Sequence, residues 1–276
     1  MINWGVLGTS FISEQMAWAI QESELAHLHA VASRDKKKAE AFAQQYQVEH
    51  YYDDYNTLLA DSSIDVVYIG LPNHLHKEWI LRCFAAGKHV LCEKPLVLNE
   101  AQALDVMEAS KKTGLFCMEA LMYRCHPFTK NIHDVVHSGA LGDIKFYHAI
   151  YNANIAHVAN PQDGGAIYNL GCYPLSLTQF LVNSTLRESM AIGQNHATHV
   201  DNDTMSSLIL RFKNGIDATI TTADALDMHW RFEILGTHGR LNVITNPWLP
   251  EPGTQVMHVY SNASTSPEII TVQSAL

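Results

Sequence analysis

Two short segments place charged and polar side chains where they could do chemistry. Cys92-Glu93-Lys94-Pro95 closes an apolar run at 88–92, so two charges directly follow an expected buried strand. Charges there are misplaced for packing, but they suit a crevice at the carboxyl ends of parallel strands, where such sheets bind ligands. Downstream, Asn169 and Tyr173 are four residues apart, which puts both side chains on one face of a helix. The two segments together offer an ammonium group, an amide and a phenol.

A glycine turn follows the first apolar run and comprises Gly8, Thr9, Ser10, Phe11, Ile12 and Ser13. Dinucleotide sites place G-x-G-x-x-G/A between a strand and a helix, where it allows a tight turn and brings pyrophosphate to the helix N-terminus. Only Gly8 matches, and Ser10 adds a Cβ where close approach is needed. The turn predicts a dinucleotide site, with an ordinary strand–helix turn as the alternative.

The second apolar run, at 28–32, ends in Ser33-Arg34. A site for NAD would use an acid near this point to bind the ribose 2′-hydroxyl. The nearby Asp35 suits a helix N-cap instead. Arg34 and Lys38 could bind a 2′-phosphate, because guanidinium geometry suits phosphate. This predicts NADP rather than NAD, with a solvated helix start as the alternative.

The elements that position these residues change character near residue 122. Before it, apolar runs alternate with helical patterns, which predicts a doubly wound parallel sheet, a Rossmann domain, over 1–122. After it, β-rich runs with short turns predict an α+β domain over 123–276 with a large, mostly antiparallel open sheet. The expected strands are 2–8, 28–32, 64–71, 88–92, 115–118, 144–151, 190–198, 204–213, 216–223, 230–235, 240–244 and 255–260. The expected helices are 11–22, 36–46, 74–86, 99–113, 126–138 and 172–182.

Composition excludes several classes of protein. Hydrophobic residues make up 47% and charged residues 17% of the 276, as in folded domains. The formal charge of −10 argues against nucleic acid or an anionic membrane as a partner. No run reaches the ~18 apolar residues of a membrane helix, and the N-terminus lacks the pattern of a signal peptide. Five scattered cysteines predict reduced thiols in a cytoplasmic protein.

Sixteen histidines raise the question of a metal. His133 and His137 lie in H-D-V-V-H, close to the H-E-x-x-H zinc pattern. Asp134 is shorter than the required glutamate and no third ligand is evident, so an exposed amphipathic helix explains the pair. The pairs His74/His76 and His196/His199 are interpreted in the same way. The sequence predicts no metal site.

Taken together, these residues resemble a known family. The chain is similar to the Gfo/Idh/MocA oxidoreductases, and most similar to their branch of dimeric dihydrodiol dehydrogenases and NADP-linked D-xylose dehydrogenases. The resemblance covers about residues 1–250. It rests on W-G-V-L-G at 4–8, A-S-R at 32–34, A-G-K-H-V-L-C-E-K-P at 86–95, M-E-A at 118–120, G-A-L-G-D-I at 139–144 and G-G-A at 164–166.

The resemblance implies a role for each candidate residue. Lys94, next to Glu93, would lie beside the nicotinamide, and Tyr173 would be the acid/base of a D-x-G-x-Y motif in which this chain has Asn169. A phenol, with a pKa of ~10, is a poor base at neutral pH, and a nearby ammonium would help it. Arg124 would lie near the cofactor, with a surface arginine as the alternative. The nicotinamide-ribose pocket would be lined by Leu71, Pro72, Asn73 and His76; for His76 a surface histidine is the alternative.

The predicted function is an NADP-dependent oxidoreductase that transfers a hydride between nicotinamide and a sugar or another small hydroxyl or carbonyl compound. We expect a homodimer through the open face of the sheet at 144–260, because that face needs cover. The alternative is a catalytically silent dinucleotide-binding sensor of the same fold. Three departures from the family favour that alternative: the altered Gly8–Ser13 turn, Asn169, and a chain that stops at Leu276, where family members usually continue.

Overall fold

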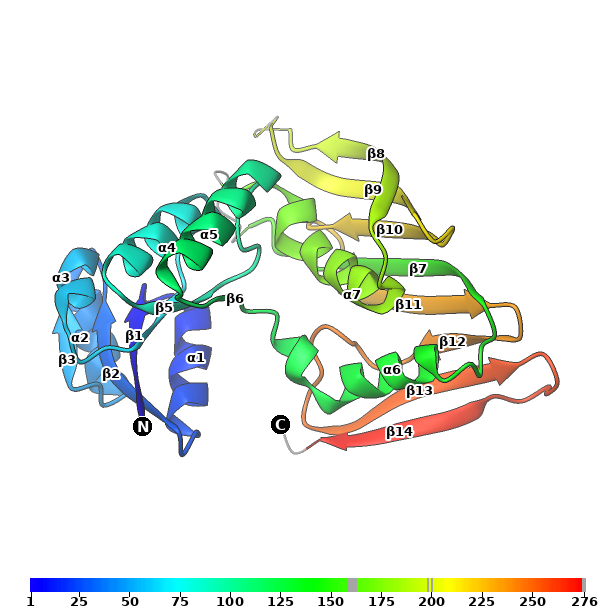
Figure 1. Cartoon of the computed structure of the whole chain (residues 1–276), viewed down its shortest axis with the longest axis horizontal. Coiled ribbons are helices and arrows are strands. Elements are labelled where there is room, and N and C mark those ends of the chain that lie inside the picture. The colour runs from blue at the N-terminus through cyan, green and yellow to red at the C-terminus, as the bar shows by residue number, and fades with distance from the viewer. Residues whose placement is uncertain (158–162, 198, 200, 275–276) are drawn as a thin grey trace. The chain divides into compact units, whose positions relative to one another are not determined.

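The computed structural model describes residues 1–157, 163–197, 199 and 201–274. The chain forms two compact units, Met1–Ala120 and Leu121–Leu276, here called the N-terminal and the C-terminal unit (Figure 1). The division lies between residues 120 and 121, against a predicted boundary after 122. No helix in the described part of the chain has the length and apolar character needed to cross a membrane.

The N-terminal unit is built on a six-stranded parallel sheet with the order β3-β2-β1-β4-β5-β6. Strand order that runs outward in both directions from β1 is the doubly wound arrangement, which confirms the predicted Rossmann domain. The strands are β1 Ile2–Leu7, β2 Ala26–Ala32, β3 His50–Tyr52, β4 Val66–Ile69, β5 His89–Cys92 and β6 Cys117–Glu119. The helices are α1 Phe11–Gln21, α2 Lys36–Gln45, α3 Tyr55–Ala60, α4 His76–Ala85 and α5 Glu100–Thr113, with a 3₁₀ turn η1 at Asn73–Leu75.

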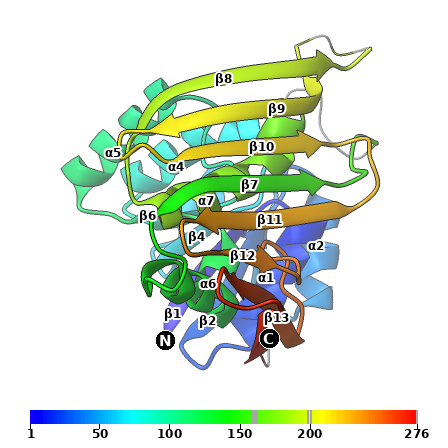
Figure 2. The same ribbon diagram turned by 90° about the vertical axis from the view of Figure 1, so that its right-hand side faces the viewer.

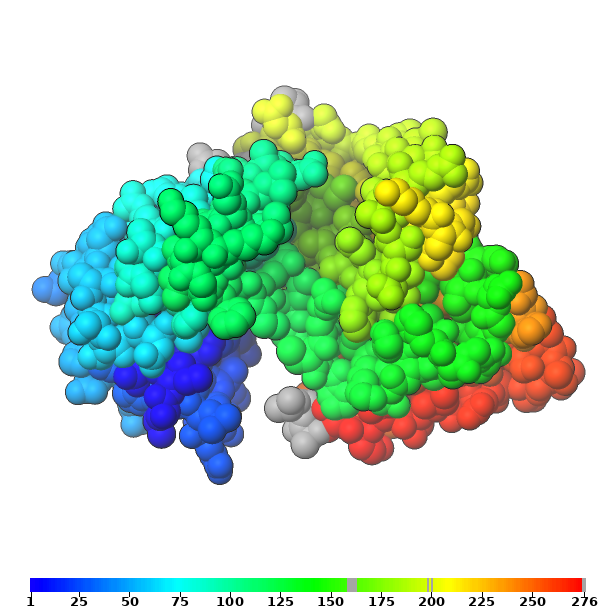
Figure 3. All heavy atoms as spheres, in the orientation of Figure 1, coloured from blue at the N-terminus to red at the C-terminus, as the bar shows by residue number. Residues whose placement is uncertain are grey.

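Alternating side chains of the central strands fill two separate hydrophobic cores. Val6 and Val31 pack with residues of α1 and α2 on one face of the sheet. Leu7, Ala30 and Ile69 pack with residues of α3, α4 and α5 on the other. Figure 1 shows α4 and α5 lying over the sheet, and in Figure 3 the atoms of this part of the chain, cyan to green, form the surface of the unit that faces the viewer. This two-sided burial explains why the central strands are nearly continuous apolar runs.

All five cysteines are free, as predicted. Three of them, Cys83, Cys92 and Cys117, lie in or against one core of the N-terminal unit. Burial, more than neighbouring charge, raises the pKa of Cys83 and of Cys117 to about 12. These thiols therefore stay protonated at neutral pH, where they are poor nucleophiles and poor metal ligands.

The C-terminal unit is built on an eight-stranded sheet with the order β14-β13-β12-β11-β7-β10-β9-β8. Among the strands that the structure describes here, only β7 and β10 pair in parallel, which confirms the predicted, mostly antiparallel sheet. The strands are β7 Ile144–Asn152, β8 Leu186–Asn195, β9 Asp203–Phe212, β10 Asp217–Ala223, β11 His229–Gly236, β12 Gly239–Val243, β13 Gly253–Ser261 and β14 Glu268–Ser274. The helical segments are η2 Met122–Cys125, α6 Pro127–His137, η3 Ile167–Gly171 and α7 Cys172–Val182.

The two faces of this sheet differ. Helices α6 and α7 cover one face, where Phe128, Leu177 and Leu181 pack on strand residues such as Tyr147 and Ile220. The opposite face is turned toward the viewer in Figure 2 and carries no helix of this unit in the described residues. Strand residues therefore alternate between the helix-covered core and an open surface.

Candidate functional site

The turn after β1 depends on a glycine. Gly8 has φ +95°, and a Cβ added there would lie 2.8 Å from the carbonyl oxygen of Gly70. Both the left-handed backbone and the close approach therefore exclude a side chain. The Gly8 N–H donates to the carbonyl oxygen of Ala32 at 2.9 Å, which ties the turn to the carboxyl end of β2.

Ser10, at the second position of the glycine pattern, is the N-cap of α1. Its hydroxyl oxygen accepts from the Ser13 backbone N–H at 3.4 Å and lies 3.3 Å from the carbonyl oxygen of Gly70. The side chain thus folds back against the helix end and β4. Phe11 begins the helix with its side chain exposed, and Thr9 and Ile12 are half-buried. A helix N-terminus formed in this way attracts anions such as phosphate.

Ser13 occupies the third position of the pattern and is completely buried. A Cβ on Gly70, just after β4, would lie 2.4 Å from the Ser13 hydroxyl oxygen. The third glycine normally lets the helix pack closely on the strand. Here the missing side chain is on the strand, so the helix can carry a serine. Gly70 is a functional position that the sequence reasoning missed; the only signal was a glycine interrupting the apolar run at 64–71.

The carboxyl end of β2 presents basic side chains to solvent. Arg34 and Lys38 are exposed, whereas Ser33 is buried and its hydroxyl accepts from the Asp35 N–H at 3.3 Å. The Asp35 carboxylate accepts from the N–H groups of Lys37 and Lys38, which confirms its role as an N-cap. The guanidinium of Arg34 is near the buried Tyr55 hydroxyl: burial raises the pKa of Tyr55, and Arg34 partly offsets that rise.

A buried histidine connects the next two strand ends. The ring nitrogens of His76 lie 2.8 Å from the carbonyl oxygen of Leu71 and 2.9 Å from that of Pro95. His76 has no exposed surface, so the alternative of a surface histidine is wrong. Leu71 and Asn73 are also buried, and Pro72 between them is half-buried. The structure therefore places His76 behind the strand ends, where it can position them.

Two carboxylates brace the Glu93-Lys94-Pro95 turn. Glu93 accepts from the Tyr68 hydroxyl at 2.7 Å and from the Lys94 backbone N–H at 3.2 Å. Glu119, at the end of β6, accepts from the Leu96 N–H at 2.9 Å. The Lys94–Pro95 peptide bond is cis. The hydrogen bonds to Glu93 and Glu119 fix the backbone on both sides of Lys94, while its side chain is half-buried at the carboxyl edge of the sheet.

In the C-terminal unit, Asn169 lies in a π-helical turn, η3, that leads directly into α7. The sequence predicted a plain helix here. The carboxylate of Asp203, on β9, accepts from the Ile167 N–H at 3.1 Å and from the Ser206 hydroxyl at 2.7 Å. A Cβ on Gly165 would lie 2.0 Å from the Asp203 carbonyl oxygen, so a glycine is needed where the chain enters the turn. Turns of this kind are often found at functional sites.

Tyr173 is 7% exposed and lies in the first turn of α7. Its ring packs edge-on against Tyr151, with centroids 5.6 Å apart, and lies 6.2 Å from the ring of Tyr123. Burial, partly opposed by a hydrogen bond with Asn246, raises the pKa of Tyr151 to about 12. The neighbouring phenol is thus neutral at neutral pH, and the Tyr173 ring is held by aromatic contacts on two sides.

The remaining candidates also belong to the C-terminal unit. Arg124, in η2, stacks its guanidinium over the ring of Phe180 at 4.6 Å. On α6, the rings of His133 and His137 stack with centroids 4.1 Å apart. His137 is exposed and His133 is half-buried, which agrees with an amphipathic helix. Arg124 is therefore an exposed side chain with an aromatic partner.

Comparison with known proteins decides the family. Residues 2–121 match the family described as "Oxidoreductase family, NAD-binding Rossmann fold", and residues 129–242 match the "GFO/IDH/MocA C-terminal domain". The chain belongs to the Gfo/Idh/MocA family of oxidoreductases. The resemblance inferred from the sequence is thereby confirmed.

Curated and solved relatives agree with this assignment. Human trans-1,2-dihydrobenzene-1,2-diol dehydrogenase is 30% identical over 90% of this chain and 76% of its own length. An uncharacterized oxidoreductase of Rhizobium meliloti, ORF334, is 32% identical over 96% of this chain and 80% of its own. KijD10, a 3-ketoreductase from Actinomadura kijaniata solved with NADP, is 27% identical with a TM-score of 0.88, over 99% of this chain and 84% of its own. These relatives make the chain an NAD(P)-dependent oxidoreductase that acts on hydroxyl or keto groups.

The contact between Gly70 and Ser13 yields a prediction. Gly70→Ala should destabilise the N-terminal unit by ~1–3 kcal/mol, because the new methyl group overlaps the Ser13 hydroxyl. Ser13→Ala removes that hydroxyl, so Gly70→Ala should cost much less in the Ser13→Ala background. Denaturant unfolding of the four proteins measures the coupling. An equal cost of Gly70→Ala in both backgrounds would show that this contact does not limit the approach of α1 to β4.

Proposed function

We propose that this protein is an NADP-dependent oxidoreductase whose substrate is a sugar or another small hydroxyl or carbonyl compound. The observation that carries the proposal is the braced turn at Glu93–Pro95. Lys94 is held there at the same carboxyl edge of the parallel sheet as the Gly8 turn and Arg34. The 3-ketoreductase and the diol dehydrogenases among the relatives support a reaction at a carbonyl or carbinol carbon.

The N-terminal unit fits a phosphorylated dinucleotide. Gly8 permits the tight turn that leads into α1, the capped N-terminus of α1 offers backbone N–H groups, and Arg34 and Lys38 offer cations for a 2′-phosphate. When bound, the cofactor supplies or accepts the hydride at its nicotinamide ring. Every other task falls to side chains of the chain itself.

We assign three side chains to the substrate. The Tyr173 hydroxyl exchanges a proton with the substrate oxygen, Asn169 holds that oxygen, and the Lys94 ammonium orients it and favours the negative charge that develops there. Solved structures of the 3-ketoreductase include single-residue variants at a lysine and at a tyrosine. That choice of residue types is in line with the roles proposed here for Lys94 and Tyr173.

A second candidate function is a dinucleotide-binding sensor without turnover. Asn169, where the family resemblance leads one to expect an aspartate, favours it, since the amide keeps a hydrogen bond but lacks the charge. The altered Gly8–Ser13 turn favours it less, because Gly70 restores the close packing of helix on strand.

Cofactor preference gives the first test of the proposal. Arg34→Ala should weaken NADPH binding about ten- to a hundredfold and leave NADH binding nearly unchanged, since one charge-assisted phosphate contact is worth ~1.5–3 kcal/mol. Lys112→Ala, which removes a charge from α5, is the matched control. Fluorescence titration of both cofactors measures the effect. Equal affinity of the wild type for NADPH and NADH would contradict the assignment.

Proton transfer gives the second test. Tyr173→Phe keeps the ring contacts but removes the hydroxyl, so kcat should fall ~10²–10⁴-fold with little change in NADPH affinity. Tyr151→Phe is the control, since it removes a hydroxyl from the ring that packs against Tyr173. Steady-state kinetics on a panel of aldoses, diols and ketones measures both.

The same panel separates the enzyme from the sensor. An enzyme turns over at least one compound, and Asn169→Asp should raise the rate on sugar-like substrates. A sensor binds NADPH but shows no turnover in the wild type. Wild-type kcat in Tyr173→Phe would remove the proton-transfer role from this residue.

We further propose that the protein is a homodimer through the open face of the C-terminal sheet. Met190 and Ile209 form a cross-strand pair there and are 71% and 54% exposed. Apolar side chains grouped in this way mark an interface. Light scattering should give twice the 30.8 kDa chain mass, and Ile209→Asp should yield monomers, whereas Leu25→Asp, at an exposed leucine in the loop before β2, should not. A wild-type monomer at micromolar concentration would contradict the proposal.

A further inference from the structure

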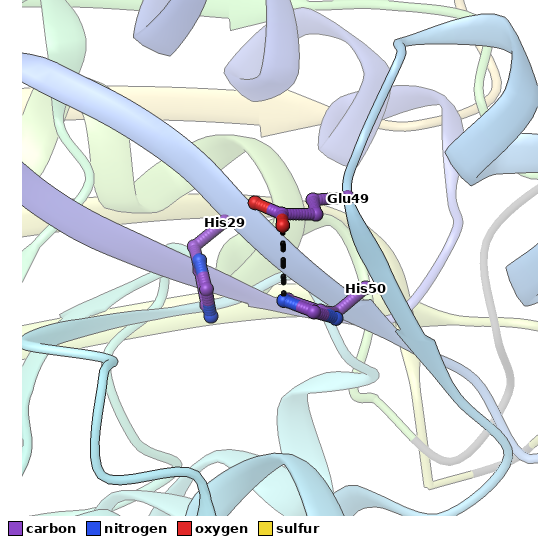
Figure 4. Close-up of side chains that lie close together, drawn as sticks. All are labelled: His29, Glu49 and His50. Atoms are coloured by element: carbon purple, nitrogen blue, oxygen red, sulfur yellow. Dashed lines mark ion pairs between the residues drawn. The ribbon is translucent and has the colours of Figure 1, made fainter.

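Three side chains that commonly bind metals gather on the edge of the N-terminal sheet. His29 lies on β2, His50 is the first residue of β3, and Glu49 directly precedes it. One nitrogen from each imidazole and one Glu49 carboxylate oxygen all lie within 4.8 Å of one another (Figure 4). In the described part of the chain no other three histidine, cysteine or acidic side chains come together so closely. The sequence reasoning passed over these residues because no spacing in the chain connects 29 with 50.

Strand pairing brings the residues together. β2 and β3 run in parallel, with Ala30 paired to His50. The register between β1 and β2 shifts at this level, from Trp4 opposite Leu28 to Gly5 opposite Ala30, so His29 is the extra residue of a bulge. Bulges commonly redirect a side chain. The His29 ring consequently lies 4.6 Å, centroid to centroid, from the ring of His50.

The His29 ring is held by a carboxylate. Its Nε2 lies 3.2 Å from Oδ2 of Asp61, and the same carboxylate accepts from the Tyr52 hydroxyl at 3.0 Å and from the Ser63 N–H at 2.8 Å. A carboxylate only accepts, so His29 donates through Nε2–H and keeps the lone pair on Nδ1. Metal-binding histidines in proteins are typically fixed by a carboxylate in this way. Asp61 is thus a positioning residue.

The other two side chains can adjust to an ion. The side chain of His29 is 11% exposed, whereas those of His50 and Glu49 are 43% and 65% exposed. His50 Nε2 and Glu49 Oε1 are 3.7 Å apart, close to the separation of two ligands around one ion. Ligands of zinc lie ~2.0–2.2 Å from the metal, so small rotations of these two exposed side chains would close the group.

We propose that His29, Glu49 and His50 form a binding site for Zn²⁺ or a similar divalent transition metal. Two imidazoles and one carboxylate are a typical three-residue zinc set, which leaves the fourth position to water. The ion would connect β3, an edge strand of three residues, to β2. The cofactor residues proposed above follow the carboxyl ends of the strands, so this site does not depend on the proposed function.

Calorimetric titration of chelator-treated protein with ZnCl₂ tests the site. The wild type should bind one Zn²⁺ with a micromolar Kd, and its unfolding temperature should rise by on the order of 5 °C at a hundredfold excess over Kd. His50→Gln, an exposed substitution that spares the fold, should weaken binding at least a hundredfold. Asp61→Asn should weaken it about ten- to a hundredfold by releasing the His29 ring.

The matched control is His133→Gln/His137→Gln, which removes the other close pair of histidine rings. This double variant should bind Zn²⁺ as the wild type does. Three results would overturn the proposal: no wild-type binding below millimolar Zn²⁺, unchanged affinity in His50→Gln, or loss of binding in the control. Circular dichroism of each variant without metal shows whether a loss of binding reflects unfolding.

Discussion

The carboxyl edge of the N-terminal sheet depends on how closely helix α1 approaches β4. Two backbone positions without side chains, Gly8 and Gly70, face each other there, and Ser13 fills the space that Gly70 leaves. A methyl group on either glycine would separate the helix from the strand. The end of α1 would then move away from the strand ends, and with it the N–H groups that suit a phosphate. The geometry of this edge therefore requires that both Gly8 and Gly70 lack a side chain.

From that edge outward, hydrogen bonds rather than apolar contacts set the geometry. His76 connects the end of β4 to Pro95, and Glu93 and Glu119 hold the two sides of the same turn. Each partner is a backbone group or a buried hydroxyl, so the network fixes the path of the chain. This network fixes the backbone from which the Lys94 side chain extends. Hydrogen-bond networks of this kind tend to rigidify the backbone, which suits the role proposed for Lys94.

Local sequence pattern was enough to predict most of the secondary structure. Apolar runs and helical periodicity predicted the central strands and both domains, and Asp35 was recognised as an N-cap from its position alone. The three-residue β3 and the six-residue α3 were not predicted, because so short a segment carries no periodicity. The seven-residue β14 was not predicted either, and most of its side chains are exposed. Contacts between residues far apart in the sequence were not predicted, for a different reason. These contacts arise from packing between elements, and no spacing in the sequence predicts them. They are Gly70 with Ser13, Asp203 with the turn that contains Asn169, and His29 with His50.

The two units differ in how they accommodate departures from the family pattern. At the cofactor side, Ser13 in place of glycine is compensated by Gly70, so the geometry that glycine normally provides is retained. At the substrate site proposed above, Asn169, where the family resemblance implies an aspartate, changes the chemistry of the side chain rather than its shape. A carboxylate only accepts hydrogen bonds, whereas an amide also donates, and a donor can hold a carbonyl oxygen. In the proposed reaction this favours a substrate bound through a carbonyl, as in a ketone reductase.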